Sequence, residues 1–191
     1  MLDSPSKSIR VFDLLVDQTR RACPPAIEQA AVQLFDETRV PLLRYLSGFP
    51  LSLHDSEDVI QEVFLELFQQ WQRGRSIQNP RAWLFRAAHH LALKEKIRSR
   101  KESEKNGSLA AVEELAVDPA LTPEDQLSFH RTQTRLESVV RALPEQHRCC
   151  LHLRAEGLRY REIAEILGIS LGKVSLSLQR SLTLIARATQ R

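Results

Sequence analysis

The stretch from Tyr160 to Arg180, YREIAEILGISLGKVSLSLQR, constrains the fold more than any other part of the sequence. Ala164 is small enough to let a second helix approach closely, and Gly168 can end the first helix with a positive φ. Ser170 can then cap the second helix. This spacing predicts a helix-turn-helix whose second helix enters the major groove of DNA. An ordinary hairpin of two helices in a bundle is the alternative, and the joint spacing favours the DNA reader.

The side chains of this stretch divide into an inner and an outer set. The inner set is apolar and supplies the contacts inside the angle between the helices: Ile163, Leu167, Ile169, Val174 and Leu178. We expect Lys173, Ser177 and Arg180 to lie on the outward side of the second helix, which faces DNA in such motifs. The predicted reading surface therefore carries little charge.

The composition favours an all-α fold. Gly is scarce, at 6 of 191 residues, and aromatic residues make up 6% of the chain, while the abundant Leu, Ala, Glu, Arg and Gln favour helices over strands. No apolar run approaches the roughly 20 residues that cross a bilayer, and the N-terminus lacks the order of a signal peptide. We expect a cytoplasmic protein without membrane insertion.

The cysteines are odd in number, at Cys23, Cys149 and Cys150. An adjacent pair is poorly placed to bridge itself or to ligate a metal, so we interpret all three as reduced thiols. The HRCCLH run at 147–152 also suggests a metal site or a redox switch, but core packing is favoured because its side chains point in different directions on a helix. His89 and His90 receive the same interpretation, and we expect no metal and no cofactor.

Charge is sorted along the chain. Residues 55–66 hold five acids and no base, residues 73–101 hold nine bases and one acid, and residues 102–128 are acidic again. From Ile166 onward the chain carries four bases and no acid. Two basic blocks on either side of an acidic spacer fit two separate contacts with a polyanion better than one continuous patch.

The acidic spacer also resembles a domain boundary. Residues 102–122 contain Asn-Gly-Ser and Asp-Pro turn signals and no long apolar stripe, and about 20 residues without structure are unusual inside one compact domain. A long surface loop is the alternative, which limited proteolysis would distinguish. We predict an N-terminal extension at 1–25, a helical domain at 26–101, a flexible linker at 102–122 and a second helical domain at 123–191.

The clearest predicted helix runs from Asp55 to Trp71. Asp55 is a plausible N-cap. The apolar residues of this helix recur at three- and four-residue steps and form a broad stripe: Val59, Ile60, Val63, Phe64, Leu67, Phe68 and Trp71. From the residues alone, its acids are best read as a solvated face.

Further helices flank this one. Asn79 and Pro80 offer an N-cap and a first helical residue for a helix reaching about Lys101. Its apolar positions are expected to face the core: Trp83, Leu84, Ala87, Ala88, Leu91 and Ile97. Residues 26–48 are helical in pattern but are expected to break or kink at Pro41, which lacks a backbone donor. In the second half, helices are expected from about Thr122 to Ala142 and from Leu143-Pro144 to Gly157.

Three motifs in order resemble the extracytoplasmic-function sigma factors of bacterial RNA polymerase. DSEDVIQEVFLELF is similar to the region-two helix that docks on the polymerase clamp, and NPRAWLFRAAHHLALKEKIRSR to the helix that meets and opens the minus-ten element. LPEQHRCCLHLRAEGLRYREIAEILGISLGKVSLSL is similar to region four, which reads the minus-thirty-five element. The resemblance covers about Ala31–Lys101 and Glu124–Arg187, and its specificity lies in the joint presence of the three motifs.

The resemblance implies a protein that catalyses nothing but binds core RNA polymerase and directs promoter-specific initiation. Its expected partners are the clamp and flap regions of the polymerase, double-stranded and melted promoter DNA, and an anti-sigma factor. It changes the interpretation of the acidic helix, whose candidate polymerase contacts are Asp55, Asp58, Gln61, Glu62 and Phe64. When bound to polymerase, the protein is expected on the nucleoid.

The DNA contacts that follow fall into two groups. Candidate minus-ten residues are Arg73, Arg75, Asn79, Arg81, Arg86, Lys94 and Arg98. Candidate minus-thirty-five residues are Ser170, Gly172, Lys173, Leu176, Ser177 and Arg180. The loop at 73–79 with the start of the Pro80 helix is expected to form a pocket for unstacked bases, whereas Trp83 is assigned to the core because it lies on the apolar face.

The chain departs from the family pattern at Arg159, at His90 and in its comparatively neutral reading face. Two other functions stay open. A conventional helix-turn-helix regulator could act without polymerase, although the acidic helix followed by a basic helix argues against it. A protein-binding regulatory module is the other, and the basic blocks argue against that.

Overall fold

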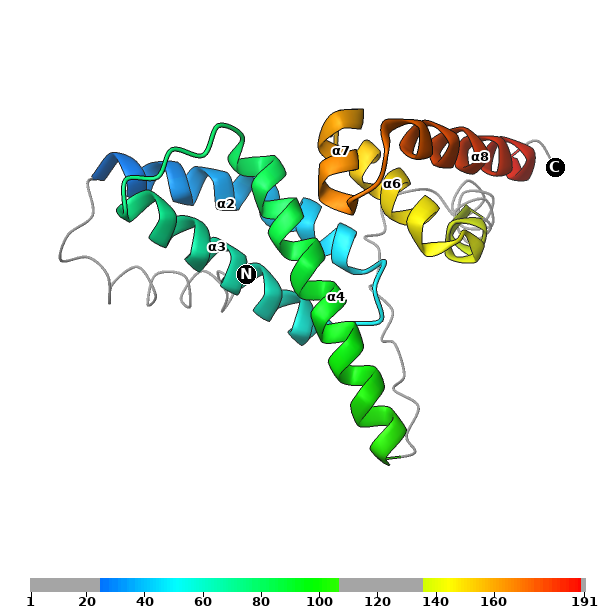
Figure 1. Ribbon diagram of the computed structural model, residues 1–191, viewed down its shortest axis with the longest axis horizontal. Coiled ribbons are helices and arrows are strands. Elements are labelled where there is room, and N and C mark those ends of the chain that lie inside the picture. The colour runs from blue at the N-terminus through cyan, green and yellow to red at the C-terminus, as the bar shows by residue number, and fades with distance from the viewer. Residues whose placement is uncertain (1–24, 107–135, 190–191) are drawn as a thin grey trace, which may run out of the picture.

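The computed structural model describes residues 25–106 and 136–189, and within these ranges every regular element is a helix (Figure 1). The helices are α2 (Pro25–Leu46), α3 (Leu53–Gln72), α4 (Pro80–Asn106), α6 (Glu145–Ala155), α7 (Tyr160–Leu167) and α8 (Leu171–Thr189). Residues 136–142, before α6, are also helical. The prediction of an all-α fold is confirmed. The predicted N-terminal extension up to residue 24 and most of the predicted linker lie outside the described residues.

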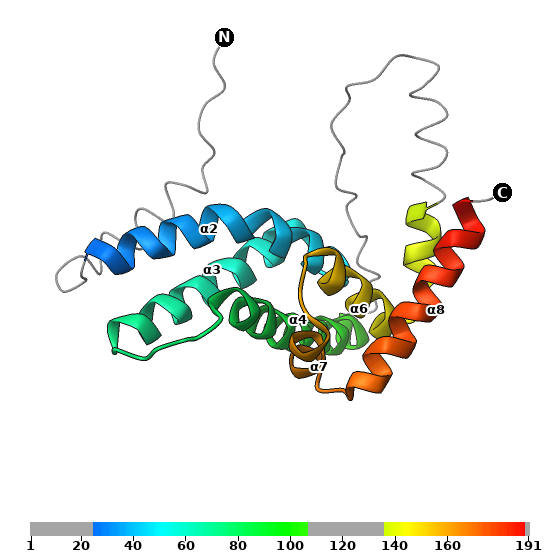
Figure 2. The same ribbon diagram turned by 90° about the horizontal axis from the view of Figure 1, so that it is seen from above.

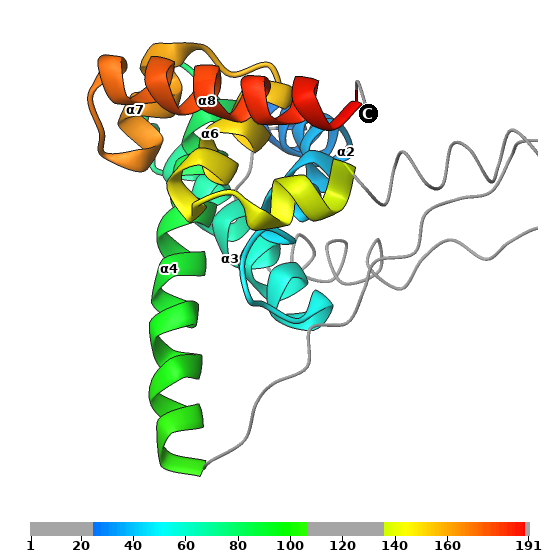
Figure 3. The same ribbon diagram turned by 90° about the vertical axis from the view of Figure 1, so that its right-hand side faces the viewer.

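Helices α2, α3 and α4 form the first helical unit, with α2 and α3 side by side and α4 packed across them (Figures 1 and 2). Its centre is apolar, since Leu42, Val63, Leu84 and Phe85 are fully buried. The apolar stripe predicted on α3 is buried from Val59 to Phe68. The last turns of α4 project beyond the other described helices (Figure 3).

Helix α3 begins earlier than predicted. Its N-cap is Ser52, whose Oγ accepts the backbone N–H of Asp55 at 3.0 Å, while the carboxylate of Asp55 accepts the backbone N–H of Ser52 at 3.2 Å. The prediction that Asp55 is itself the N-cap is therefore wrong. Asp55 occupies the third helical position, where its carboxylate completes a capping box.

Helix α2 does not break at Pro41. It is continuous from Pro25 to Leu46, so the break, one of the two outcomes expected at Pro41, does not occur. Pro41 removes one backbone hydrogen bond, but the next turn places Leu42, Tyr45 and Leu46 in the core, each no more than 1% exposed. Burial of these three side chains outweighs the lost hydrogen bond and holds the helix together.

Helix α4 begins as predicted and ends later. The Asn79 side-chain oxygen accepts the backbone N–H of Ala82 at 3.1 Å, which caps the helix at Pro80. The helix continues to Asn106, so its last turn occupies the first residues of the predicted linker. Ile97 was expected in the core but is 56% exposed, so that expectation is wrong. Trp83 is half-buried against the core, as expected.

The second unit contains the predicted helix-turn-helix. Helix α7 ends at Gly168, whose φ is +63°, a left-handed conformation that glycine adopts without strain. The Ser170 hydroxyl then accepts the backbone N–H of Lys173 at 3.3 Å at the start of α8. Ile163 and Val174 are fully buried between the helices. The motif is confirmed, and local sequence signals account for each part of its turn.

The two units pack against each other and share one apolar core. Helix α7 contacts α4, and α6 contacts α2. Tyr45 on α2 and Cys149 on α6 are both buried in this shared core. Helix α8 thereby lies on the far side of α6 and α7 from α3 (Figures 1 and 2).

Candidate functional site

The outward face of α8 is the first part of the candidate site. Lys173, Leu176 and Arg180 are exposed, and Gly172 has no atom within 4 Å of the position that a Cβ would occupy. Positive and neutral side chains thus share a surface without obstruction from the rest of the described chain. Such a surface can enter a groove of DNA.

Ser177 does not belong to that face. It is only 2% exposed, and its hydroxyl accepts a hydrogen bond from the Gln146 side chain of α6 at 3.2 Å. The prediction that it lies on the outward side is wrong. Ser177 falls three residues after buried Val174 and four before buried Ser181, so the helical repeat turns it toward α6.

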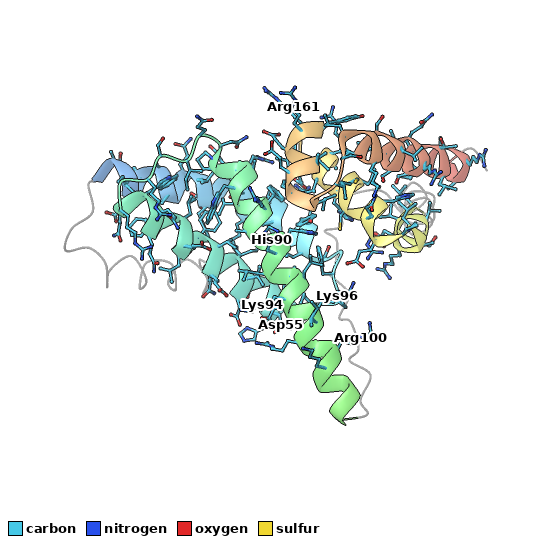
Figure 4. All side chains as sticks on the ribbon, viewed as in Figure 1. Asp55, His90, Lys94, Lys96, Arg100 and Arg161 are labelled. Carbon is cyan, nitrogen blue, oxygen red and sulfur yellow. The ribbon has the colours of Figure 1, made fainter. Side chains whose placement is uncertain are left out.

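Two further residues of this unit are exposed, of which Arg161 was missed from the sequence. Gln179 follows Leu176 by three residues and is exposed on the same side of α8. Arg161 lies on α7, and its side chain points away from the other helices (Figure 4). The signal that could have found Arg161 is the usual crossing of the DNA backbone by the first helix of such motifs.

The acidic start of α3 is the second part of the site. Asp58 and Glu62 are exposed, and Gln61 is half-buried. The hydrogen bond from the Ser52 hydroxyl holds the pKa of Asp55 below its ordinary value, so this carboxylate is charged and engaged in the helix cap. Phe64 is only 3% exposed and packs edge-on against Phe35 at 5.0 Å between ring centroids. Its burial agrees with the apolar stripe predicted for this helix, so Phe64 offers little surface to a partner in this structure.

Helix α4 and the loop before it carry the basic residues. Arg73 and Arg75 are exposed in the loop, and Arg86 and Lys94 are exposed on the helix. Arg98 forms an ion pair with Glu95 one turn earlier, at 2.7 Å. Figure 4 shows Lys94, Lys96 and Arg100 spreading from the lower half of α4. The helix offers several positive groups to a polyanion, although the pair at Arg98 reduces the local charge.

Two residues predicted to bind minus-ten DNA, Asn79 and Arg81, contact the second unit in this structure. The Asn79 side-chain nitrogen donates to the Glu162 carboxylate of α7 at 2.6 Å. Arg81 donates to the backbone oxygen of Glu156 at 2.8 Å and lies 3.7 Å from its carboxylate, which Arg44 also approaches at 3.2 Å. In this arrangement the start of α4 is occupied by the loop between α6 and α7 and by the start of α7.

Further polar contacts close the other side of the same interface. Lys96 forms an ion pair with Glu145 at 2.6 Å. Arg148 on α6 donates to the backbone oxygen of Gly48 at 2.9 Å. Hydrogen bonds and ion pairs therefore surround the apolar contact between the two units.

Buried polar groups lie at the centre of this interface. The Tyr45 hydroxyl and His89 Nδ1 are 2.7 Å apart. Burial lowers the pKa of His89 to about 4 and raises the pKa of the Cys149 thiol to about 11, so the imidazole is neutral and the thiol protonated at neutral pH. Burial also raises the pKa of Cys150 and lowers that of His152. These groups act as uncharged packing residues.

The described ranges contain neither a metal-binding cluster nor a membrane-spanning helix. Among residues 25–106 and 136–189, no cluster of three or more His, Cys, Asp or Glu side chains could hold a metal ion. In the same part of the chain, no helix has the length and apolar character needed to span a bilayer. Cys23 lies outside the described residues.

Comparison with known proteins gives matches to both helical units. Residues 34–102 match the family model for Sigma-70 region 2, and residues 133–185 match that for Sigma-70, region 4. The first match covers the second half of α2, all of α3 and most of α4. The second covers α6, α7 and most of α8. Sequence order and helix order thus agree with the two units of a sigma factor.

Whole-chain relatives agree with these matches. The chain is 32% identical to the RNA polymerase sigma factor YlaC of Bacillus subtilis over 161 residues, which cover 82% of this chain and 87% of the relative. It is 33% identical over 179 residues to the ECF RNA polymerase sigma factor SigE of Mycolicibacterium smegmatis, covering 89% of this chain and 63% of that protein. It is 26% identical over 155 residues to the RNA polymerase sigma-H factor of Pseudomonas aeruginosa, covering 78% and 80%.

Sigma factors are initiation factors rather than enzymes, and their partners are core RNA polymerase and promoter DNA. The helix-turn-helix, the basic α4, the two family models and the named relatives all point to the same class of protein. This chain therefore belongs to the sigma-70 family, as a promoter-recognising RNA polymerase sigma factor of the extracytoplasmic-function group.

Proposed function

We propose that this sigma factor binds the polymerase clamp through the acidic start of α3 and the polymerase flap through its second unit. Support for the clamp contact comes from Asp58 and Glu62, which are exposed side by side on α3 with no other described helix over them. Gln61 lies beside them. Asp55 contributes by fixing the start of the helix, and Phe64 contributes from beneath by packing in the core.

The same proposal assigns the minus-ten contact to the start of α4. Arg73 and Arg75 precede the helix, and Arg86 and Lys94 lie along it, so positive side chains are available to the backbone of the melted strand. Asn79 and Arg81 join them once they are released from Glu162 and Glu156. Arg98 contributes less because Glu95 neutralises it.

The minus-thirty-five contact is assigned to the outward face of α8. Ser170 and Gly172 lie at its first turn, where the backbone can approach DNA, and Lys173 and Arg180 supply the positive charge. Ser177 supports this face from within through its contact with Gln146.

The two units have to separate for both elements to be bound at once. The elements lie about 25 base pairs apart, which is about 85 Å of B-form DNA. The hydrogen bond between Asn79 and Glu162 instead joins the start of α4 directly to α7, and α8, with 19 residues, is only about 28 Å long. We therefore propose that contacts with the polymerase replace those between the units and hold them apart.

An anti-sigma factor would act on the equilibrium between the packed and the separated arrangement of the two units. A regulator that stabilises the contact between α4 and α7 would keep Asn79 and Arg81 away from DNA. Such a regulator is therefore one of the proposed partners. The sigma factor itself is proposed to be cytoplasmic and to join the nucleoid when it is bound to polymerase.

The observation that carries the proposal is the presence, on one chain, of an unobstructed α8 reading face and a basic α4 preceded by an exposed acidic surface. The test is to mix the full chain with core RNA polymerase and measure complex formation and promoter-dependent initiation. A stable complex that starts transcription at defined sites is expected. DNA binding without any complex with the polymerase would favour a conventional helix-turn-helix regulator and overturn the proposal.

A further inference from the structure

The centre of the α8 reading face is neutral and combines one apolar side chain with one amide. Leu176 is 46% exposed, and Gln179 is exposed three residues later. Residues at this spacing are neighbours on a helix, with Cβ atoms about 5–6 Å apart. That distance lies between one and two base-pair steps of about 3.4 Å each. The two side chains can therefore reach neighbouring or next-but-one base pairs in the same groove.

Leu176 is not part of the buried core. The residues of α8 that face α6 and α7 are Val174, Ser177, Leu178 and Ser181, all at most 2% exposed. Leu176 lies outside that set, in the N-terminal half of the helix, where recognition helices touch base edges. An exposed leucine there suits an apolar surface in the groove.

The groove offers one such surface on its base edges. In the major groove only thymine presents a methyl group, and apolar side chains contact it, whereas the amide of Gln pairs with N7 and N6 of adenine. Guanine and cytosine are read instead by Arg, Lys or acidic side chains. At the centre of this face, between Lys173 and Arg180, the chain carries one group for thymine and one for adenine.

We propose that Leu176 and Gln179 make the upstream promoter element specific for A·T base pairs, with Leu176 packed on a thymine methyl and Gln179 hydrogen-bonded to a nearby adenine. This inference rests on the proposed function of α8 and names the bases that it reads. Lys173 and Arg180 flank the pair and can hold phosphates or an adjoining guanine. Specificity then comes from neutral groups and affinity from the charged ones.

The test starts with promoters selected from a library in which the upstream segment is randomised, using the full chain bound to core RNA polymerase. Each thymine of the selected element is then replaced by deoxyuridine, which lacks only the methyl group. The expected result is one position at which this change weakens binding about fourfold, the effect of one buried methyl-sized group. The Leu176→Ala variant should show no such loss at that position.

Leu182→Ala is the matched control, because Leu182 is 56% exposed on the same helix, on a different side and nearer the C-terminus. It should keep the response to deoxyuridine. In parallel, Gln179→Ala should lose its preference at one adenine and become insensitive to 7-deazaadenine, which lacks N7. The wild type should discriminate against that analogue.

The outcomes separate this inference from the proposed function. Selected elements with only G·C pairs under α8, or equal responses of the wild type and Leu176→Ala to deoxyuridine, would overturn the A·T specificity. Promoter-dependent initiation would still stand in that case. A failure to select any DNA with the polymerase complex would remove both the proposed function and the inference.

Discussion

The side-chain amide of Asn79 and the carboxylate of Glu162 are joined by a hydrogen bond of 2.6 Å across 83 residues of sequence. Each group also fixes the start of its own helix. The Asn79 oxygen accepts the N–H of Ala82 in α4, and the second oxygen of Glu162 accepts the N–H of Arg159 before α7 at 2.6 Å. The helix that is proposed to open the promoter and the helix-turn-helix are thus tied together at their first turns.

This link can be broken without loss of either cap. Asn79→Asp keeps an N-cap side chain for α4. In the wild type the Asn79 amide donates to Glu162, whereas the variant places a second carboxylate against it. We expect the contact between the units to weaken by about 1–3 kcal/mol, with a larger radius of gyration in small-angle X-ray scattering. The effect should be largest at low salt, because salt screens the repulsion.

Asn79→Ser is the control for that variant. It also caps α4 but introduces no charge, so its radius of gyration should lie between those of the wild type and Asn79→Asp. Identical scattering from all three proteins would show that the bond does not hold the units together.

Gly172 allows stability and DNA binding to be separated. A Cβ at this position would meet no atom within 4 Å, and Ala is more stable than Gly in a helix by up to about 1 kcal/mol. Gly172→Ala should therefore raise the melting temperature of the free protein. If the backbone of α8 approaches DNA here, the added methyl should weaken binding of the upstream element. A more stable protein with unchanged promoter affinity would remove Gly172 from the DNA surface.

The acidic start of α3 can be tested by charge reversal. Asp58→Lys combined with Glu62→Lys alters two exposed side chains and leaves the buried stripe intact. We expect affinity for core polymerase to fall by about tenfold or more, because charged surfaces that face each other would become alike in sign. Glu66→Lys, another exposed acid one turn later on α3, is the comparison. Equal losses in both variants would indicate a general charge effect rather than a contact surface.

His89 predicts a pH dependence of stability. Burial, with a smaller effect of His90, lowers its pKa from 6.5 to about 4 in the folded protein. Between these values the unfolded chain binds a proton that the folded chain does not, so stability falls as the pH falls. The loss of stability from this group should reach roughly 3 kcal/mol by pH 4. His89→Gln, which keeps a polar partner for Tyr45, should show a shallower decline in urea unfolding between pH 6.5 and 4.5; an unchanged slope would contradict this assignment.

Local sequence signals predicted much of this fold because they act within a few residues. Gly168 and Ser170 define the turn before α8, and Asn79 with Pro80 starts α4, each through contacts with its own neighbours. The capping box at Ser52 and Asp55 was also readable, since Ser and an acid three residues apart form that motif. The candidate site was less predictable, because the burial of Ser177 depends on the packing of α6 against α8.

The sequence by itself determined the helices, the helix-turn-helix and, through the order of its motifs, the sigma-factor family. The tertiary structure decided that α2 continues through Pro41, that Ser177 faces α6, and that Asn79 and Arg81 contact the second unit. Caps and helical periodicity are local and can be read along the chain. Burial and long-range ion pairs depend on residues far apart in sequence, and these determine which of the proposed DNA-binding residues are exposed in the free protein.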